Sequence, residues 1–392
     1  MQIQSGVSTS FITPEALKNK IYNNESPFIL DVREPFEHEN WRIDGSANIP
    51  LGTLKENMNV IPKDKEIVTV CLHGIRSERA RQMLAGLGYK ARTMAGGMVA
   101  WNSIYDIVEV PANFSAVKVR EENKPAASKA KEKSSEYSHY SLHVLQFRRI
   151  GKGCLSYMVI SGKETAVIDP AFDANVYIEA AKSRGAEIVA VLDTHTHADH
   201  VSGGWRLADI MGCNYYSPDN KIKHEHENIE NGATITIGSA VINAVHTPGH
   251  TPESVTYILG SLAFTGDTLF VESVGRPDLG QDAKTNGVFL WETLNNVFIA
   301  LPDSTKILPS HYSKNLLSEK DRAIIASIGE LKNNLKALKM SKNEFVDWIS
   351  KSEMPKPPNF DVIKGINLGH ELFADEDEIR EIEAGPNRCA VV

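Results

Sequence analysis

The stretch Thr194-His195-Thr196-His197-Ala198-Asp199-His200 brings three imidazoles and one carboxylate into seven residues. It follows the run Ile188-Val189-Ala190-Val191-Leu192, whose apolar and mostly β-branched residues predict a buried strand. The stability of a fold does not require so many histidines and carboxylates so close together. Metal ions in proteins, however, are bound by these side chains. The stretch therefore predicts a metal site at the end of a buried strand.

Further histidines and carboxylates follow other predicted strands. His250 lies in the loop after residues 240–245, Asp267 closes residues 262–266, and His311 follows residues 307–310. We expect these strand ends to meet at the rim of a β-sandwich. The candidate ligands are His195, His197, Asp199, His200, His250, Asp267 and His311. Their number alone allows a dinuclear zinc or iron hydrolase.

Residues 142 to 315 carry these segments in an order that resembles the metallo-β-lactamase superfamily. The resemblance implies an αββα sandwich. The run Gly275-Arg276-Pro277-Asp278-Leu279 resembles, more narrowly, a segment of the persulfide dioxygenases. Those enzymes hold one Fe(II) with two histidines and one carboxylate, so the resemblance implies the ligands His195, His250 and Asp267. Such a face leaves positions open for O₂ and a substrate sulfur.

The resemblance also implies roles for the residues around the iron. The histidines and the carboxylate outside the ligand set would orient the ligands and bond to substrate; they are His197, Asp199, His200 and His311. Arg276 would bind the carboxylate of a thiol carrier such as glutathione. Ser313 stands where glutathione-using members carry a tyrosine, with Tyr312 beside it as a substrate-binding candidate. The thiol carrier therefore stays open.

A second chemistry is predicted near the N-terminus. Short apolar runs at residues 27–32 and 66–70 alternate with helix-like segments, as in a parallel α/β sheet with helices on both faces. The second run ends in Cys71-Leu72-His73-Gly74-Ile75-Arg76-Ser77. A cysteine between such a strand and a helix faces the ligand-binding crevice, where the helix N-terminus favours a thiolate. Arg76 adds a positive charge for an oxyanion.

Residues 8 to 107 resemble the rhodanese sulfurtransferases. The match includes the Cys71 loop, Asp31-Val32-Arg33-Glu34, the run Gly45 to Pro50, and Gly96-Gly97 with Trp101. The four residues between Cys71 and Arg76 match the sulfurtransferase loop, whereas the related phosphatases have one more. The resemblance implies that Cys71 attacks a sulfane sulfur and carries it as a persulfide.

Length, composition and charge limit how many domains the chain can contain. A chain of 392 residues with 42% hydrophobic and 23% charged residues suits two or three globular domains. We expect a rhodanese domain (8–110), a flexible linker (115–140), a dioxygenase domain (141–316), its helical and Pro-rich extension (317–370) and an acidic tail (371–392). That tail has seven acidic residues and two arginines and is predicted to be a solvated end.

No basic cluster suggests nucleic acid, and no apolar run is long enough for a membrane span. The four cysteines are far apart and no secretory signal is visible, so we expect a reducing, cytoplasmic setting. Cys154 and Cys213 are expected to be core or surface thiols. In the extension, Ile324, Ile328, Leu331, Leu335 and Leu338 predict one amphipathic helix, which packs on the core or in a homodimer.

The sequence thus predicts oxidation of a thiol persulfide with O₂ to sulfite and thiol at one Fe(II), coupled through Cys71 to thiosulfate or sulfite. The direction of that sulfur transfer stays open. The main alternative is a thioesterase of the glyoxalase II type with two zinc or iron ions. The residues also leave open a Cys-loop phosphatase and a non-catalytic sulfide sensor or scaffold.

Overall fold

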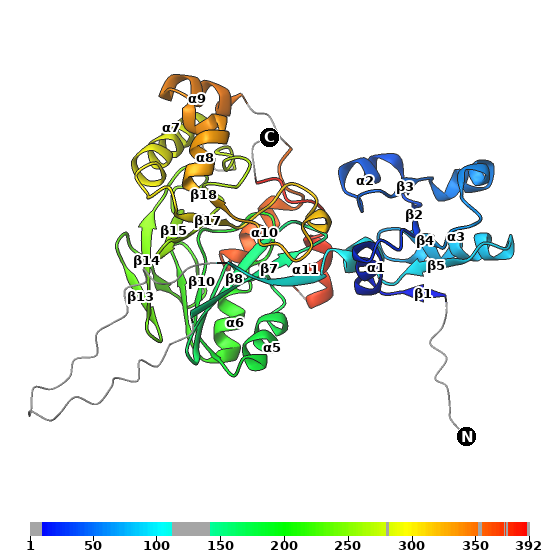
Figure 1. Cartoon of the computed structure of the whole chain (residues 1–392), viewed down its shortest axis with the longest axis horizontal. Helices are drawn as coiled ribbons and strands as arrows, with labels where there is room; N and C mark the ends of the chain where they lie inside the picture. The colour runs from blue at the N-terminus through cyan, green and yellow to red at the C-terminus, as the bar shows by residue number, and fades with distance from the viewer. Residues whose placement is uncertain are drawn as a thin grey trace, which may run out of the picture.

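The computed structural model describes residues 10–111, 142–279, 282–351, 355–371, 373 and 375–389. The predicted linker lies outside these residues. An N-terminal α/β domain lies beside a larger sandwich, and the C-terminal helix α11 (Glu376–Ile382) lies between the two (Figure 1). Among the described helices, none has the length and apolar character needed to span a bilayer.

The N-terminal domain is built on a parallel sheet in the order β1-β5-β4-β2-β3. The central strand β4 (Ile67–Val70) is buried along its whole length. Helix α1 (Pro14–Tyr22) begins after Thr13, whose hydroxyl accepts a hydrogen bond from the backbone N–H of Ala16. The other elements are β1 (Phe11–Ile12), β2 (Phe28–Asp31), β3 (Ala47–Asn48), β5 (Ala91–Met94), α2 (Pro35–Asn40), α3 (Ile75–Gly86), α4 (Gly97–Trp101) and a 3₁₀ helix (Leu51–Val60).

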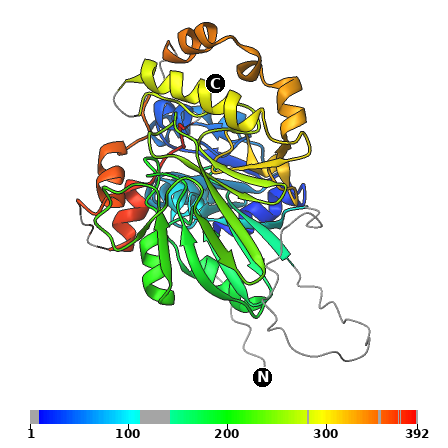
Figure 2. The same cartoon turned by 90° about the vertical axis from the view of Figure 1, so that its left-hand side faces the viewer.

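The larger domain has two sheets packed face to face (Figure 2). The first runs in the order β12-β11-β10-β9-β8-β7-β6 and the second in the order β13-β14-β15-β16-β17-β18. Their strands are β6 (Tyr105–Glu109), β7 (Leu142–Arg149), β8 (Leu155–Ser161), β9 (Glu164–Ile168), β10 (Glu187–Leu192), β11 (Asn214–Ser217), β12 (Glu227–Asn228), β13 (Thr234–Ile237), β14 (Ala240–His246), β15 (Val255–Leu259), β16 (Leu262–Gly266), β17 (Lys306–Pro309) and β18 (Ala326–Ser327).

Helices cover the outer faces of both sheets, which confirms the predicted αββα sandwich. Helices α5 (Asn175–Ser183) and α6 (Gly204–Met211) pack on the first sheet through Tyr177 and Leu207. Helices α7 (Ala283–Thr293) and α9 (Lys342–Ser350) pack on the second through Leu290 and Phe345. Between the sheets, Tyr157 and Phe264 meet edge to face, with ring centroids 5.1 Å apart.

The two domains share one hydrophobic core. Strand β6 directly follows the N-terminal domain and pairs antiparallel with β7 of the sandwich. Trp41 and Trp101 pack into the same buried cluster as Ile150 and Leu155. The indole N–H of Trp41 also donates to the carbonyl oxygen of Gly151 at 2.8 Å. The joint is therefore a packed interface as well as a covalent connection.

The amphipathic helix predicted across residues 324–338 is interrupted. Helix α8 covers only Ile328–Asn334, and Leu335 has an extended backbone before a 3₁₀ turn at Lys336–Lys339. Ser327 forms a capping box with Glu330, which fixes the start of α8 after β18. The apolar spacing was a correct guide to burial, but the prediction of one continuous helix was wrong.

The acidic end is solvated along one face, as predicted, but it also packs on the sandwich. Six of its seven acidic side chains are exposed, and Glu383 is buried. Helix α11 buries Ile379 against Phe172, Val201 and helix α10 (Phe360–Asn367). Glu383 is 3% exposed and forms an ion pair with Arg149 at 2.5 Å. The acidic composition gave no sign of these partners, because they lie far away along the chain.

Candidate metal centre and cysteine loop

The seven candidate ligands, three of them predicted to bind the metal, lie together at one rim of the sandwich. The loop after β10 supplies four of them, and the segments after β14, β16 and β17 supply one each. Each is at most 2% exposed; they are His195, His197, Asp199, His200, His250, Asp267 and His311. Buried histidines and carboxylates at this density require either a metal or a closed network of hydrogen bonds.

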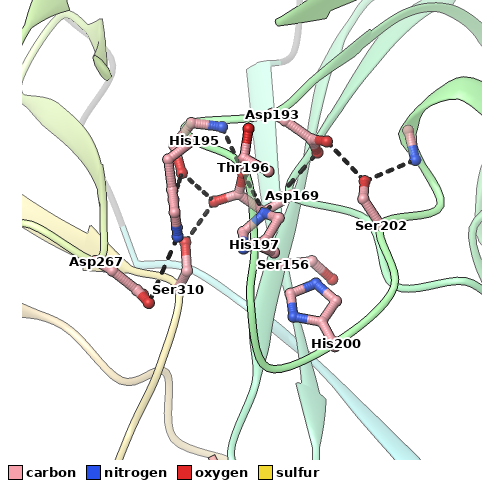
Figure 3. Close-up of polar contacts among 12 residues, drawn as sticks. Ser156, Asp169, Asp193, His195, Thr196, His197, His200, Ser202, Asp267 and Ser310 are labelled. Carbon is pink, nitrogen blue, oxygen red and sulfur yellow. Dashed lines mark hydrogen bonds and ion pairs between the residues drawn. The ribbon is translucent and has the colours of Figure 1, made fainter. Parts of the chain in front are cut away.

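Three of these side chains converge on one point. The Nε2 atoms of His195 and His250 each lie 3.6 Å from Oδ2 of Asp267. Figure 3 shows His195 directed toward Asp267. Oδ2 of Asp267 is buried and has no hydrogen-bond partner among the described residues. Ligand atoms that each lie about 2.1 Å from one ion are separated by roughly 3 to 4 Å, so this face suits a metal.

The hydrogen bonds behind the two histidines free their Nε2 lone pairs. Nδ1 of His250 lies 2.8 Å from the carbonyl oxygen of Arg276, which can only accept. Nδ1 of His195 lies 2.9 Å from the hydroxyl of Thr194. That hydroxyl donates its own hydrogen bond to Asp169, so it can only accept one from His195. Both rings therefore carry their proton on Nδ1. A histidine in this tautomer presents Nε2 to a metal.

The protonation states agree with this use. Burial lowers the pKa of His250 to about 4, so the ring is neutral at pH 7. Burial alone would raise the pKa of Asp267, but the charge of His311, its contact with Oδ1 at 2.6 Å and the nearby ring of His195 hold this pKa well below its usual range. A neutral imidazole and an ionised carboxylate are the forms that bind a metal.

A second group lies next to this face. Its potential ligand atoms, within 4.8 Å of one another, come from Cys154, Asp199, His200 and His311. His311 connects the two groups, because Nδ1 lies 2.6 Å from Oδ1 of Asp267 and Nε2 lies 2.9 Å from Oδ2 of Asp199. Burial opposes protonation of His311, but these two carboxylates raise its pKa well above the usual value. The thiol of Cys154 donates to Asp199 at 3.4 Å.

His197 faces a third group, with Asp169 and Asp193. Its Nε2 lies 3.3 Å from Oδ1 of Asp169, and its buried Nδ1 has no hydrogen-bond partner among the described residues. Asp169 also accepts a hydrogen bond from the backbone N–H of Thr194. Figure 3 shows Ser310 beside Asp169, to which its hydroxyl also donates. Asp169 thus ties the histidine loop to the strand end that carries His311.

The sequence did not identify every residue of this cluster. Cys154 was predicted to be a core or surface thiol. It is buried, and its sulfur also lies 3.4 Å from Asp199 of the cluster, a contact that the sequence did not indicate. Asp169 and Asp193 were given no role, although both lie with His197, and Cys389 was given none, although it lies with Asp267 and His311. Asp169 did carry a signal, since it closes a predicted strand in the way that Asp267 does.

Arg276 and Tyr312 were predicted to bind substrate. Arg276 contacts the C-terminal extension, and Tyr312 lies at the interface between the two domains. The guanidinium of Arg276 binds both carboxylate oxygens of Asp278 at 2.6 Å and donates to the carbonyl oxygens of Pro355 and Arg388. The hydroxyl of Tyr312 donates to Glu319 at 3.4 Å. Its ring lines a cavity of about 190 Å³ between the domains.

Metal affinity is expected to rise with pH through the pKa of His195. Burial opposes protonation of this ring, but the carboxylate of Asp267, 3.6 Å from Nε2, raises the pKa of His195 above the ordinary value. The metal must displace that proton, so each pH unit below the pKa should weaken binding by about tenfold. Competition titration with a coloured chelator measures this, and an affinity that is constant from mildly acidic to neutral pH would contradict it.

The cysteine loop of the N-terminal domain surrounds the sulfur with donors. Backbone N–H groups of Gly74 and Ser77 point at Sγ of Cys71, at 3.2 and 3.3 Å. These groups belong to the start of α3, whose dipole also favours a negative sulfur. Arg76 flanks the loop, and its guanidinium binds both oxygens of Glu37 at 2.7 and 2.8 Å.

Gly97 should be essential for the shape of this loop. Its φ is +60°, and a Cβ there would lie 2.3 Å from the carbonyl oxygen of Cys71. We expect Gly97→Ala to lower the urea midpoint for unfolding of the N-terminal domain. Gly88→Ala is the matched control, because Gly88 has φ +85° but open space around it, so that its cost is only about 1 kcal/mol of backbone strain. Equal effects of the two substitutions would contradict the crowding argument.

Comparisons with known proteins support this division of the chain. Residues 13–104 match the rhodanese-like domain family, and residues 149–311 match the metallo-beta-lactamase superfamily. The chain therefore joins a rhodanese domain to a metallo-beta-lactamase domain, and this confirms both predicted resemblances.

Similar proteins include two kinds of enzyme. A mitochondrial persulfide dioxygenase ETHE1 of Bos taurus is 29% identical over 53% of this chain and 79% of that protein. A probable hydroxyacylglutathione hydrolase of Schizosaccharomyces pombe is 34% identical over 39% of this chain and 61% of that protein. The crystal structure of ETHE1 from Myxococcus xanthus is 25% identical with a TM-score of 0.53, covering 58% of this chain and 98% of that one.

Proposed function

We propose that the chain oxidises a low-molecular-weight persulfide with O₂ at a single Fe(II). The overall reaction is R-S-SH + O₂ + H₂O → R-SH + sulfite + two protons. The observation that carries the proposal is the three-ligand face: two Nε2 atoms at 3.6 Å from an unpartnered carboxylate oxygen. Its relatives named persulfide dioxygenase support the substrate class.

In this proposal His195, His250 and Asp267 hold the iron. Bound there, Fe(II) supplies the redox chemistry that joins O₂ to the terminal sulfur of the persulfide. The chain contributes the surroundings: Thr194 and the carbonyl of Arg276 fix the two imidazoles, and His311 holds a proton against Oδ1 of Asp267. Burial of all these groups excludes bulk water from the reacting sulfur.

Cys71 provides a second activity in the same proposal. Its thiolate would take the sulfane sulfur of thiosulfate, forming a Cys71 persulfide and releasing sulfite. In the reverse direction, the Cys71 persulfide would transfer its outer sulfur to sulfite and form thiosulfate. The N–H groups of Gly74 and Ser77 stabilise the anionic sulfur in either direction. The substrates are small molecules, and glutathione is the first thiol carrier to test. We also propose that the chain forms a homodimer, in which the helical extension would pack against its partner.

An oxygen electrode tests the dioxygenase activity. Protein loaded with Fe(II) under argon is given persulfides of glutathione, coenzyme A or inorganic sulfide, and O₂ uptake and sulfite are followed together. We expect one sulfite for each O₂ with at least one of these persulfides. Failure with all three would overturn the proposal.

A dinuclear thioesterase is the second candidate function. The group Cys154, Asp199, His200 and His311 could hold another ion, and the relatives named hydroxyacylglutathione hydrolase fit that chemistry. This alternative predicts hydrolysis of glutathione thioesters without any O₂ uptake. The same preparations, assayed with a thioester, distinguish the two functions.

A further inference from the structure

Two buried side chains near the C-terminus bind the rear loop of the metal centre, which comprises residues 197–202 and belongs to no helix or strand of the sandwich. Asn367, the last residue of α10, is 4% exposed, and Glu383, directly after α11, is 3% exposed. Buried backbone groups outside regular structure need hydrogen-bond partners from elsewhere in the chain. Several of these groups in the rear loop find their partners in the two C-terminal side chains.

Asn367 makes three hydrogen bonds to the rear loop. Its side-chain amide donates to the carbonyl oxygens of His197 at 2.8 Å and of His200 at 2.9 Å. Its side-chain oxygen accepts from the backbone N–H of Ser202 at 2.9 Å. One side chain therefore fixes the backbone on both sides of Asp199.

Glu383 binds the backbone group between these contacts. One of its carboxylate oxygens accepts from the backbone N–H of Val201 at 2.6 Å, and the other pairs with Arg149 at 2.5 Å. Its backbone carbonyl oxygen accepts from the side chains of Lys152 at 2.8 Å and Asn102 at 3.4 Å. Because Asn102 belongs to the N-terminal domain and Arg149 to the sandwich, Glu383 attaches the rear loop to the joint between the two domains.

The residues just before the rear loop are held by the sandwich itself. The backbone N–H of Thr194 donates to Asp169 at 2.7 Å, and its carbonyl oxygen accepts from the backbone N–H of Val255 at 2.9 Å. The position of His195 therefore depends on the two sheets, whereas the position of Asp199 depends on the C-terminal helices.

We propose that Asn367 and Glu383 are positioning residues of the metal centre, so that α10 and α11 are coupled to metal binding. They hold Asp199 where its Oδ2 lies 2.9 Å from Nε2 of His311. His311 in turn lies 2.6 Å from Oδ1 of Asp267, whose other oxygen belongs to the three-ligand face. The inference rests on the proposed metal centre, but it does not depend on the reaction that the metal performs.

Zinc affinity of full-length variants, measured by competition with a coloured chelator, tests the coupling. Asn367→Ala removes all three hydrogen bonds to the rear loop, and we expect it to weaken zinc binding by about tenfold. Asn359→Ala is the matched control: it removes a hydrogen bond at 2.8 Å to the carbonyl oxygen of Ile382 and, at φ +54°, adds backbone strain. This control weakens the contact between α10 and α11 without touching the rear loop, so its zinc affinity should be unchanged. An unchanged affinity in Asn367→Ala, or equal losses in the two variants, would overturn the proposal.

Hydrogen exchange of the unaltered chain gives a second measurement that needs no variant. If α10 and α11 strengthen metal binding, the bound metal must stabilise these helices by the same factor. We expect zinc to slow amide exchange in α10 and α11 by about tenfold more than in α9, which packs on the second sheet away from the rear loop. Equal slowing in all three helices would overturn the proposal. O₂ uptake is measured in parallel: coupling without O₂ uptake refutes only the dioxygenase function, and O₂ uptake without coupling refutes only this inference.

Discussion

Asp267→Asn is expected to abolish persulfide-dependent O₂ uptake and to weaken metal binding by more than about 100-fold. Asp267 is the one residue shared by both histidines of the three-ligand face, whose Nε2 atoms lie 3.6 Å from its Oδ2. The amide removes the negative charge without changing the size of the side chain. Its Oδ1 partner, Nδ1 of His311, also loses a carboxylate at 2.6 Å. Metal analysis after dialysis and the oxygen electrode measure the two effects.

A matched pair of histidine variants controls for damage to the fold. His250→Ala should behave like Asp267→Asn, because its Nε2 belongs to the same face. His246→Ala changes an exposed histidine four residues earlier, whose ring lies against the carbonyl oxygen of Pro252. We expect His246→Ala to keep its metal and its O₂ uptake. Equal losses in the two variants would mean that the loop, and not the ligand, is responsible.

The second large effect is expected at the other cysteine site. Cys71→Ser should reduce sulfur transfer from thiosulfate to a thiol acceptor by at least about 1,000-fold, because the hydroxyl cannot carry a sulfane sulfur. Its O₂ uptake with glutathione persulfide should remain, since that reaction belongs to the metal centre. Thiosulfate consumption and O₂ uptake, assayed on one preparation, separate the two activities.

Cys213→Ser is the control for Cys71→Ser. Cys213 is partly buried beside helix α6, away from both candidate sites, and burial raises the pKa of its thiol to about 11. Sulfur transfer should be unaffected by this change. If Cys71→Ser still moved sulfur from thiosulfate, the role assigned to the cysteine loop would be wrong.

Features encoded by neighbouring residues could be predicted from the sequence. The strand before His195 depends on residues within a few positions of one another, so its pattern is visible in the chain. The seven candidate ligands were visible in the same way, since they all follow predicted strands. The choice of His195, His250 and Asp267 among them came only from the resemblance to the persulfide dioxygenases. Their convergence then follows from the resemblance to a known fold.

Contacts between distant segments could not be predicted. Glu383 is buried by Arg149, and Cys389 reaches Asp267 and His311 only because Arg276 fixes the end of the chain. Cys154 had no local signal, since a buried cysteine near a strand is usually an ordinary core residue. The break at Leu335 shows the opposite case, in which apolar spacing continues after the helix has ended.

An iron titration tests the central claim most directly. Metal-free protein receives increasing Fe(II) under argon, and the initial rate of O₂ uptake with persulfide is measured at each step. One iron held by His195, His250 and Asp267 predicts a rate that rises linearly and stops at one equivalent per chain, with zinc inactive. A rate that requires two equivalents, or thioester hydrolysis that zinc supports in place of O₂ uptake, would contradict the account.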